Sequence, residues 1–132
     1  MTNNTIAKKW LAAFNEHNLE MLLSLYDENA EHFSPKLKLW NPESKGKIIG
    51  KDALKNWWKE AFERIPELAY FENTITASDN RVFMEYTRVV PGEENLNVAE
   101  VLEIEDGLIV ASRVYHGWNL INIFHKPAQT KN

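Results

Sequence analysis

Glu100 is the residue of this sequence whose position most needs a chemical explanation. Val98, Leu102 and Ile104 share one face of a strand by its two-residue period, and Glu100 lies among them. Burying a carboxylate on an apolar face is costly unless the group is paired, hydrogen-bonded or protonated. We therefore treat Glu100 as a candidate catalytic residue, acting as a proton donor or electrostatic stabiliser. The alternative is a structural carboxylate that pairs with an arginine or accepts a hydrogen bond from a tyrosine.

His32 and His116 are the candidate bases that would work with this carboxyl group. Histidine is the side chain most readily poised to exchange a proton near neutral pH. His32 lies two residues before Ser34 in an extended run, so these two side chains are expected to share a face. The alternative for each histidine is a structural group held by hydrogen bonds.

The strand that contains Glu100 is expected to pair with residues 81–90. If the loop at 91–95 closes a simple hairpin, the register gives three cross-strand pairs: Tyr86 with Glu100, Arg88 with Val98, and Met84 with Leu102. The shared face is then mostly apolar with polar groups at one end, as in a pocket whose polar groups orient a ligand. Tyr86 and Arg88 are predicted to orient a ligand oxygen, and Met84 to contact the ligand.

Asp106-Gly107 marks the turn that follows this strand. Asp-Gly between two runs of alternating apolar residues is typical of a two-residue type I′ hairpin. An ideal register across the turn places Arg113 opposite Glu100. A bulge near Ala111 would instead point a different set inward: Ser112, Val114 and His116. The sequence leaves both registers open.

Large aromatic side chains are placed to form the walls of such a pocket. Helical spacing puts Trp10, Phe14 and Trp58 on apolar helix faces, and Trp118 follows the last strand. With Tyr86 they would suit a flat apolar ligand. The alternative is that they only fill a small core.

Helices come first along the chain and strands follow. Apolar residues at helical spacing predict three helices, within residues 6–17, 19–26 and 51–65. Alternating residues predict strands over 68–77 and 81–90 and in the closing hairpin, whereas 36–46 is expected to be a loop with a possible short strand. This order predicts an α+β fold, with the three N-terminal helices packed on a curved antiparallel sheet.

Composition narrows the classes of function. A chain of 132 residues predicts one domain, at 1–124, with a disordered tail at 125–132. Cysteine is absent, which excludes disulfides and thiolate chemistry, and a net charge of −4 without a basic stripe argues against nucleic acid. The sequence shows no signal peptide or membrane span, so a cytoplasmic location is expected. Neither metal-ligand spacing nor a nucleotide motif is present, so no metal and no cofactor are expected.

Three segments together resemble a known family: LYDENAEHFSP, GKDALKNWW and VAEVLEIEDGLIVASRVYHG. They are similar to the SnoaL-like branch of the nuclear transport factor 2 (NTF2) superfamily, which also holds polyketide cyclases and ketosteroid isomerase. The resemblance covers Ile6 to about Trp118 and implies an NTF2-like, or cystatin-like, cone with one internal pocket. The same architecture hosts isomerases, cyclases, hydrolases, dehydratases and non-catalytic modules, so the resemblance implies the fold rather than one activity.

The resemblance also assigns expected roles, with departures from the family pattern. The general-base Asp of ketosteroid isomerase precedes a Pro, and Ser34 occupies that position here, so the base is missing. Its oxyanion-hole Asp matches Glu100, its oxyanion-hole Tyr falls at Trp10, and the Tyr that supports this Tyr falls at Trp58. An indole N–H donates a hydrogen bond but cannot transfer a proton. SnoaL-type cyclases place an acid/base Asp near the end of the last strand, where this chain has His116.

The sequence therefore predicts a SnoaL-like protein that binds a small, largely apolar molecule in an internal pocket, with acid/base chemistry of the isomerase, cyclase or dehydratase type. The alternative is a non-catalytic ligand-binding or association module of the same fold. An open cavity faced by Glu100 and a histidine would favour the enzyme, and a closed Glu100–Arg113 pair the module. A homodimer through the sheet is also expected, because the outer sheet face offers more apolar surface than a lone antiparallel sheet usually shows to water. Its residues are Phe83, Thr87, Val89, Val101 and Val110.

Overall fold

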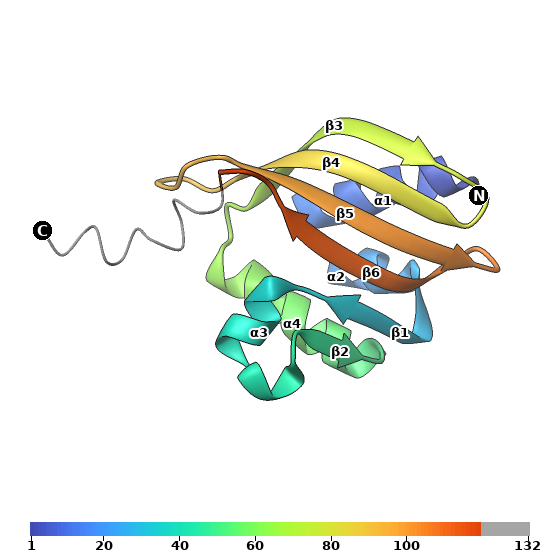
Figure 1. Cartoon of the computed structure of the whole chain (residues 1–132), viewed down its shortest axis with the longest axis horizontal. Helices are drawn as coiled ribbons and strands as arrows, with labels where there is room; N and C mark the ends of the chain where they lie inside the picture. Colours follow the sequence, from blue (N-terminus) through green and yellow to red (C-terminus); the bar gives the residue numbers. More distant parts are fainter. Residues whose placement is uncertain (120–132) are drawn as a thin grey trace, which may run out of the picture.

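The computed structural model describes residues 1–119 and contains the three predicted helices (Figure 1). These are α1 (Asn3–Asn15), α2 (Leu19–Ser24) and α4 (Lys51–Arg64). The side chains of Thr2 and Asn18 cap the first two by accepting hydrogen bonds from backbone N–H groups of the first turn. Gly50 precedes α4 with a φ of 91°, a conformation that glycine adopts without a steric penalty. The tail predicted at 125–132 lies outside the described residues.

Two segments of the first half differ from the prediction. Tyr26, predicted to continue the second helix, instead opens the strand β1 (Tyr26–Phe33). The segment predicted as a loop contains the helix α3 (Pro35–Trp40) and the 3-10 turn η1 (Pro42–Ser44), followed by the short strand β2 (Lys47–Ile49). Ser34 caps α3 and Pro35 fits its first turn, so a helix start lies in a segment whose Pro and Gly content suggested a loop.

The predicted meander of four antiparallel strands is confirmed. It consists of β3 (Ala69–Ala77), β4 (Arg81–Val89), β5 (Leu96–Glu105) and β6 (Leu108–His116). The full sheet has six strands in the order β2-β1-β6-β5-β4-β3. Because β1 pairs with β6 in parallel, the sheet is mixed rather than wholly antiparallel as predicted. The long connection from β1 through α4 to the meander allows this parallel pairing.

The register of β5 against β6 follows the bulged alternative. Asp106 and Gly107 both have positive φ, of 52° and 78°, as a type I′ turn requires. The register then shifts next to Glu103 and Ile104, so that Glu100 lies opposite Val114 rather than Arg113. The residues of β6 that the bulge turns toward the helices are Ser112, Val114 and His116.

The register of β4 against β5 differs from the prediction by two residues. Met84, not Tyr86, lies opposite Glu100, and the other two predicted pairs are also wrong: Tyr86 faces Val98 and Arg88 faces Leu96. The connection is longer than predicted, because the last pair joins Arg88 to Leu96 and leaves residues 89–95, rather than 91–95, between the paired strands. A shift of two residues preserves the face, so the predicted set of inward residues on these strands is confirmed.

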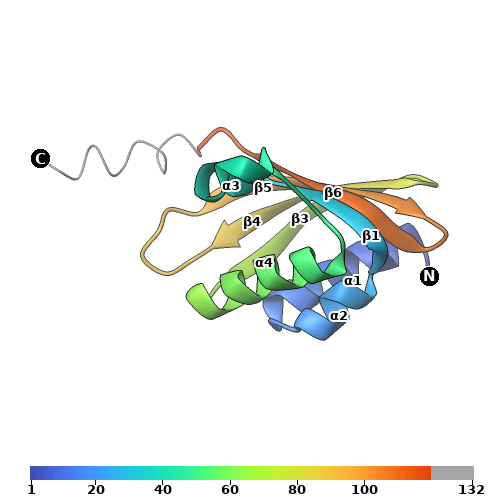
Figure 2. The same ribbon diagram turned by 90° about the horizontal axis from the view of Figure 1, so that it is seen from below.

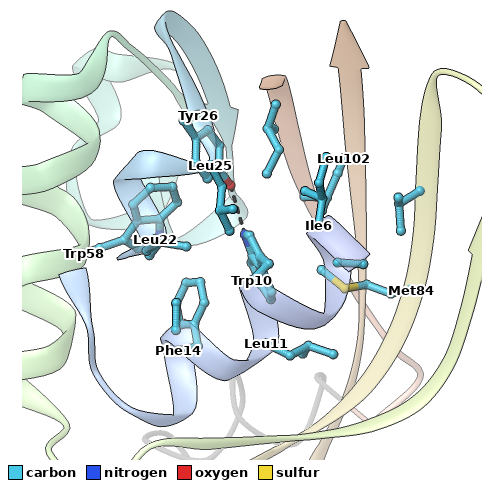
Figure 3. Packing of buried hydrophobic residues seen from close by; sticks show 14 of the residues in the cluster. Ile6, Trp10, Leu11, Phe14, Leu22, Leu25, Tyr26, Trp58, Met84 and Leu102 are labelled. Carbon is cyan, nitrogen blue, oxygen red and sulfur yellow. Dashed lines mark hydrogen bonds between the residues drawn. The ribbon is translucent and has the colours of Figure 1, made fainter. Parts of the chain in front are cut away.

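The helices α1, α2 and α4 cover one side of the curved sheet, and α3 lies beside the end of β1 (Figure 2). The main core lies between α1 and the sheet, where Trp10, Ile6 and Met84 are fully buried (Figure 3). This core leaves a cavity toward the far end of α1, framed by α4, β1 and the meander. Within residues 1–119, no helix has both the length and the apolar character that crossing a membrane requires.

Candidate functional site

A cavity of about 70 Å³ lies between the helices and the inner face of the sheet. Nine of the predicted site residues line it: Trp10, Phe14, His32, Ser34, Trp58, Tyr86, Arg88, Glu100 and His116. Glu100 and both candidate histidines line this cavity together.

Two predicted site residues do not line the cavity. Met84 lies opposite Glu100 in the strand register but is fully buried in the main core near Ile6 (Figure 3). Trp118 follows the last strand and is 80% exposed, so it belongs to the surface and not to the walls.

Several lining residues were not predicted. Tyr70 on β3 packs its ring 4.3 Å from that of Tyr86, measured between centroids. Lys36 on α3 reaches the cavity from the segment predicted as a loop. Alternation along 68–77 could have identified Tyr70. The remaining missed residues come from α4, the connection to β3 and the strands: Trp57, Ala61, Arg64, Ile65, Leu68, Val98 and Val114.

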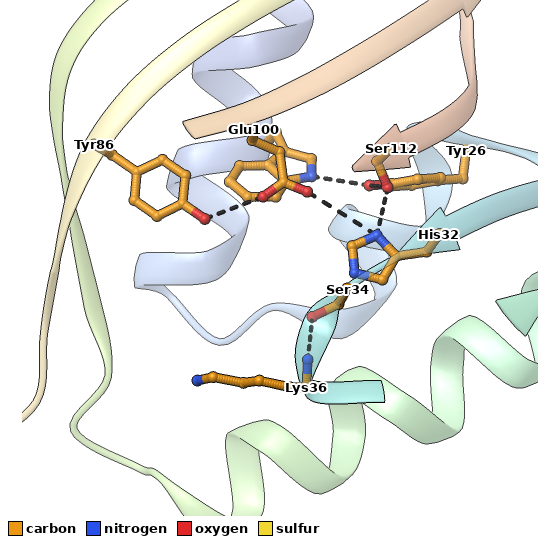
Figure 4. A network of polar contacts seen from close by, with 8 residues as sticks. Tyr26, His32, Ser34, Lys36, Tyr86, Glu100 and Ser112 are labelled. Carbon is orange, nitrogen blue, oxygen red and sulfur yellow. Dashed lines mark hydrogen bonds and ion pairs between the residues drawn. The ribbon is translucent and has the colours of Figure 1, made fainter. Parts of the chain in front are cut away.

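Glu100 is 1% exposed, and its two carboxyl oxygens have different surroundings. The Tyr86 hydroxyl donates a hydrogen bond of 3.1 Å to Oε1 (Figure 4). Oε2 is buried and has no hydrogen-bond partner among the described residues. Burial raises the pKa of the Glu100 carboxyl well above its ordinary value, and the Tyr86 hydrogen bond only partly offsets this. The group is therefore a neutral carboxylic acid that can donate a hydrogen bond through Oε2.

No arginine pairs with Glu100 in the described part of the chain, so the ion-pair form of the structural alternative is wrong, whereas its other form, a hydrogen bond from a tyrosine, is present at Tyr86. Arg113 points to the outer face of the sheet, where it bonds Glu103. Arg88 lines the cavity but donates to Glu93 at 2.9 Å. Arg113 points outward because the bulge in β6 turns its side chain away from the inner face of the sheet.

A chain of buried hydrogen bonds holds His32 (Figure 4). Trp10 Nε1 donates to the Tyr26 hydroxyl at 3.0 Å, Tyr26 donates to Ser112 Oγ at 2.9 Å, and Ser112 Oγ lies 2.7 Å from His32 Nδ1. Since Ser112 accepts from Tyr26, its own hydrogen is free to go to His32 Nδ1. This assignment places the ring hydrogen of His32 on Nε2, which points away from Ser112.

His32 is 3% exposed, and its burial lowers the pKa of the imidazole to about 3. Its Nδ1 lies 4.0 Å from Glu100 Oε2, beyond hydrogen-bond distance. Taking both groups out of water disfavours an ion pair, and at 4.0 Å no shared hydrogen bond compensates for the loss of hydration. Both side chains are therefore neutral at physiological pH.

His116 is half-buried near the end of β6, and its Nδ1 atom is buried without a hydrogen-bond partner in the described residues. Burial, together with the positive charges of Lys36 and Arg88, lowers the pKa of this imidazole to about 4. His116 is thus a neutral imidazole, with an open ring nitrogen, on the same cavity as the Glu100 acid.

The cavity combines one neutral acid, two neutral imidazoles and the phenol groups of Tyr70 and Tyr86, whose pKa values burial raises. Such a set can donate hydrogen bonds to a ligand oxygen and accept a proton from a ligand carbon or hydroxyl. Residues 1–119 contain no group of three His, Cys, Asp or Glu side chains placed to hold a metal ion.

The sequence matches the model of the SnoaL-like domain over residues 7–112. Among solved structures, a SnoaL-like protein of unknown function from Burkholderia thailandensis is 25% identical, with a TM-score of 0.79 over 87% of this chain and 93% of that chain. No protein of curated function matches the sequence.

Two more distant structures show the fold alone. An NTF2-like protein of unknown function from Cytophaga hutchinsonii is 18% identical, with a TM-score of 0.72 over 94% of this chain and 96% of that chain. A hypothetical protein with a ketosteroid isomerase-like fold from Catenulispora acidiphila is 16% identical, with a TM-score of 0.68 over 87% and 86%. From the match that spans most of its length, this chain belongs to the SnoaL-like domain family.

Proposed function

We propose that this protein is an acid/base enzyme that acts on a small carbonyl compound bound in the cavity. The observation that carries the proposal is the open Oε2 of the buried, neutral Glu100 carboxyl, which shares the cavity with the unpartnered Nδ1 of His116. Buried polar atoms are almost always hydrogen-bonded, and open ones call for an explanation. A ligand oxygen at Glu100 and a ligand C–H at His116 would give each atom its missing partner.

The chemistry follows from these positions. His116 takes the proton from a carbon next to the carbonyl group, and the electron pair of that C–H bond moves onto the carbonyl oxygen. Glu100 donates a hydrogen bond to the developing oxyanion while Tyr86 holds its other oxygen. His32, whose ring hydrogen lies on Nε2, is a second donor on the same cavity. His32 therefore serves as an orienting donor rather than the base.

Isomerisation, cyclisation and dehydration share this enolate step and differ in the fate of the enolate. Return of the proton to another carbon isomerises the ligand, loss of a β-hydroxyl group dehydrates it, and attack of the enolate on a second carbonyl closes a ring. The walls formed by Trp10, Phe14 and Trp58 favour a ligand with an apolar body.

The test is hydrogen–deuterium exchange of ligand C–H groups, because every reaction of this class begins with the same proton transfer. We expect the protein to accelerate exchange next to the carbonyl of 2-pentanone and of 4-oxopentanoate in D₂O, followed by NMR. Glu100→Gln and His116→Gln should each reduce that rate by about 10²-fold or more. Glu103→Gln, on the same strand but facing outward, is the matched control.

Exchange at the buffer rate for both ketones, or unchanged exchange in the two cavity variants, would contradict the proposal. In that case the alternative of a non-catalytic ligand-binding module would stand.

A further inference from the structure

Lys36 is a charged residue on the cavity that the acid/base chemistry does not use. It lies in the first turn of α3, is partly buried and lines the cavity with Arg88 and His116. Its Nζ has no hydrogen-bond or ion-pair partner within residues 1–119. An ammonium group that is partly removed from water without a direct ion-pair partner is unfavourable, because the more distant charge of Glu93 offsets only part of the cost, and a bound anion would relieve the rest.

The charges around the cavity leave one positive charge without a partner. Arg88 is paired with Glu93 at 2.9 Å, and Arg64 is paired with Glu60 at 3.1 Å. The Glu100 carboxyl is neutral because of its burial. Of the three cations that line the cavity, Lys36 alone thus lacks an acidic partner among the described side chains.

From this geometry we infer that Lys36 and Arg88 bind the carboxylate of a monoanionic substrate, a small keto acid whose carbonyl end reaches Glu100. The inference rests on the proposed function for the role of Glu100, and adds the charge of the substrate. A single unpaired cation matches a single negative charge. Arg88 strengthens the site because its guanidinium has further N–H donors besides the one given to Glu93.

The bound carboxylate would also improve the proposed base. The charges of Lys36 and Arg88 help to hold the pKa of His116 at about 4, which makes the empty protein a weak base. An anion between these cations opposes their effect, so the pKa of His116 should rise toward the range in which imidazole takes protons efficiently. The negative charge of the substrate would then make His116 a stronger base.

Burial, with the positive charges of Arg88 and Arg64 and against the negative charge of Glu93, lowers the pKa of Lys36 to about 8. Its charge is therefore present at neutral pH and is lost in mild alkali. The affinity for an anion should therefore fall as the pH rises from about 7 to about 9. Lys36→Arg should bind across that whole range, because guanidinium stays charged.

The experiment compares the equilibrium binding of benzoate with that of benzamide, a neutral molecule of the same shape, by tryptophan fluorescence and calorimetry. We expect the wild-type protein to prefer benzoate, and Lys36→Met to reduce that preference by at least about tenfold. Lys59→Met, which removes an exposed lysine of α4, is the matched control. NMR titration should show a raised pKa for His116 when benzoate is bound.

Equal affinity of the wild-type protein for the two ligands, including a lack of binding by both, would overturn the inference. A preference unchanged by Lys36→Met would also overturn it. Loss of the preference in Glu100→Gln alone would overturn it too, because it would place the carboxylate at the deep end of the cavity. Because binding is measured without turnover, failure of ketone exchange with an intact benzoate preference would remove the proposed function and leave the anion site.

Discussion

Glu100 and His32 approach each other to 4.0 Å, between Oε2 and Nδ1, yet each stays neutral because both are buried. The Ser112 hydroxyl takes the place of Glu100 as the partner of His32 Nδ1, at 2.7 Å. This leaves the carboxyl hydrogen available to a ligand. The two groups therefore have different roles. Glu100 is an acid that can donate a hydrogen bond to a ligand, and His32 is an imidazole that Ser112 holds in place.

The first prediction concerns the stability of the protein without the Glu100 carboxyl. Glu100→Gln keeps the shape, an oxygen for the Tyr86 hydrogen bond and a donor at the other atom. We therefore expect the free energy of unfolding at neutral pH to hold or rise, while exchange activity falls. Urea unfolding at about pH 7 checks this, with Glu103→Gln as the outward-facing comparison on the same strand.

The sign of the pH dependence supports that expectation. A carboxyl group whose pKa is raised in the folded state binds more protons there than in the unfolded chain, so stability falls as the pH rises above about 4.5. The glutamine variant removes this decline. A loss of about 3–5 kcal/mol on substitution would show instead that Glu100 is an ionised partner of a buried charge.

The second prediction concerns acid stability and His32. Because the folded-state pKa of His32 is lowered to about 3, the unfolded chain binds more protons between about pH 3 and pH 6.5. Stability should fall in that window as the pH decreases, by up to about 1.4 kcal/mol per pH unit. His32→Gln should remove this component from urea unfolding curves measured between about pH 4 and pH 7.

Glu100 has the opposite slope in part of the same window, so the comparison is best made in the Glu100→Gln background. Identical pH profiles with and without His32 in that background would be inconsistent with a buried neutral imidazole.

The third prediction is negative and concerns Δ5-3-ketosteroids. Ser34 stands where the ketosteroid isomerase pattern has its base, and here its hydroxyl oxygen caps α3 by accepting a hydrogen bond of 3.2 Å from Lys36 N. A missing positioned base removes about 10²–10⁴-fold in rate. We expect no efficient isomerisation of 5-androstene-3,17-dione in a spectrophotometric assay, and efficient turnover would identify a different base on the cavity.

The fourth prediction is a homodimer formed through the outer face of the sheet. Phe71, Phe83 and Tyr115 are exposed on this face by 59%, 43% and 52%. A second copy related by a two-fold axis would cover these rings with the same patch. Light scattering should give twice the mass of the chain, and Phe83→Lys should shift the protein toward the monomer.

Val101, which was also predicted to form this surface, is a poor choice for the test because it is only 7% exposed. Its cross-strand neighbours on the outer face are Phe83 on β4 and Arg113 on β6. A monomer at micromolar concentration for the wild-type protein would rule out the dimer.

The sequence by itself determined the helices α1, α2 and α4, the meander and the inward face that carries Glu100. These features depend on periodicity within one segment, and an error of two residues in the β4–β5 register left the face unchanged because side chains alternate with a period of two. The Asp106-Gly107 turn was equally local, since its backbone angles follow from residue type.

Only the tertiary structure decided what Glu100 contacts. The bulge in β6 turned Arg113 outward and brought Ser112 and His116 inward, and no residue type near Ala111 forced that choice. Lys36 reached the cavity because the short helix α3 folds beside it, although its local sequence reads as a loop. Protonation and pairing depend on burial and on neighbours that are distant in the chain, and these exist only once the sheet has closed over the helices.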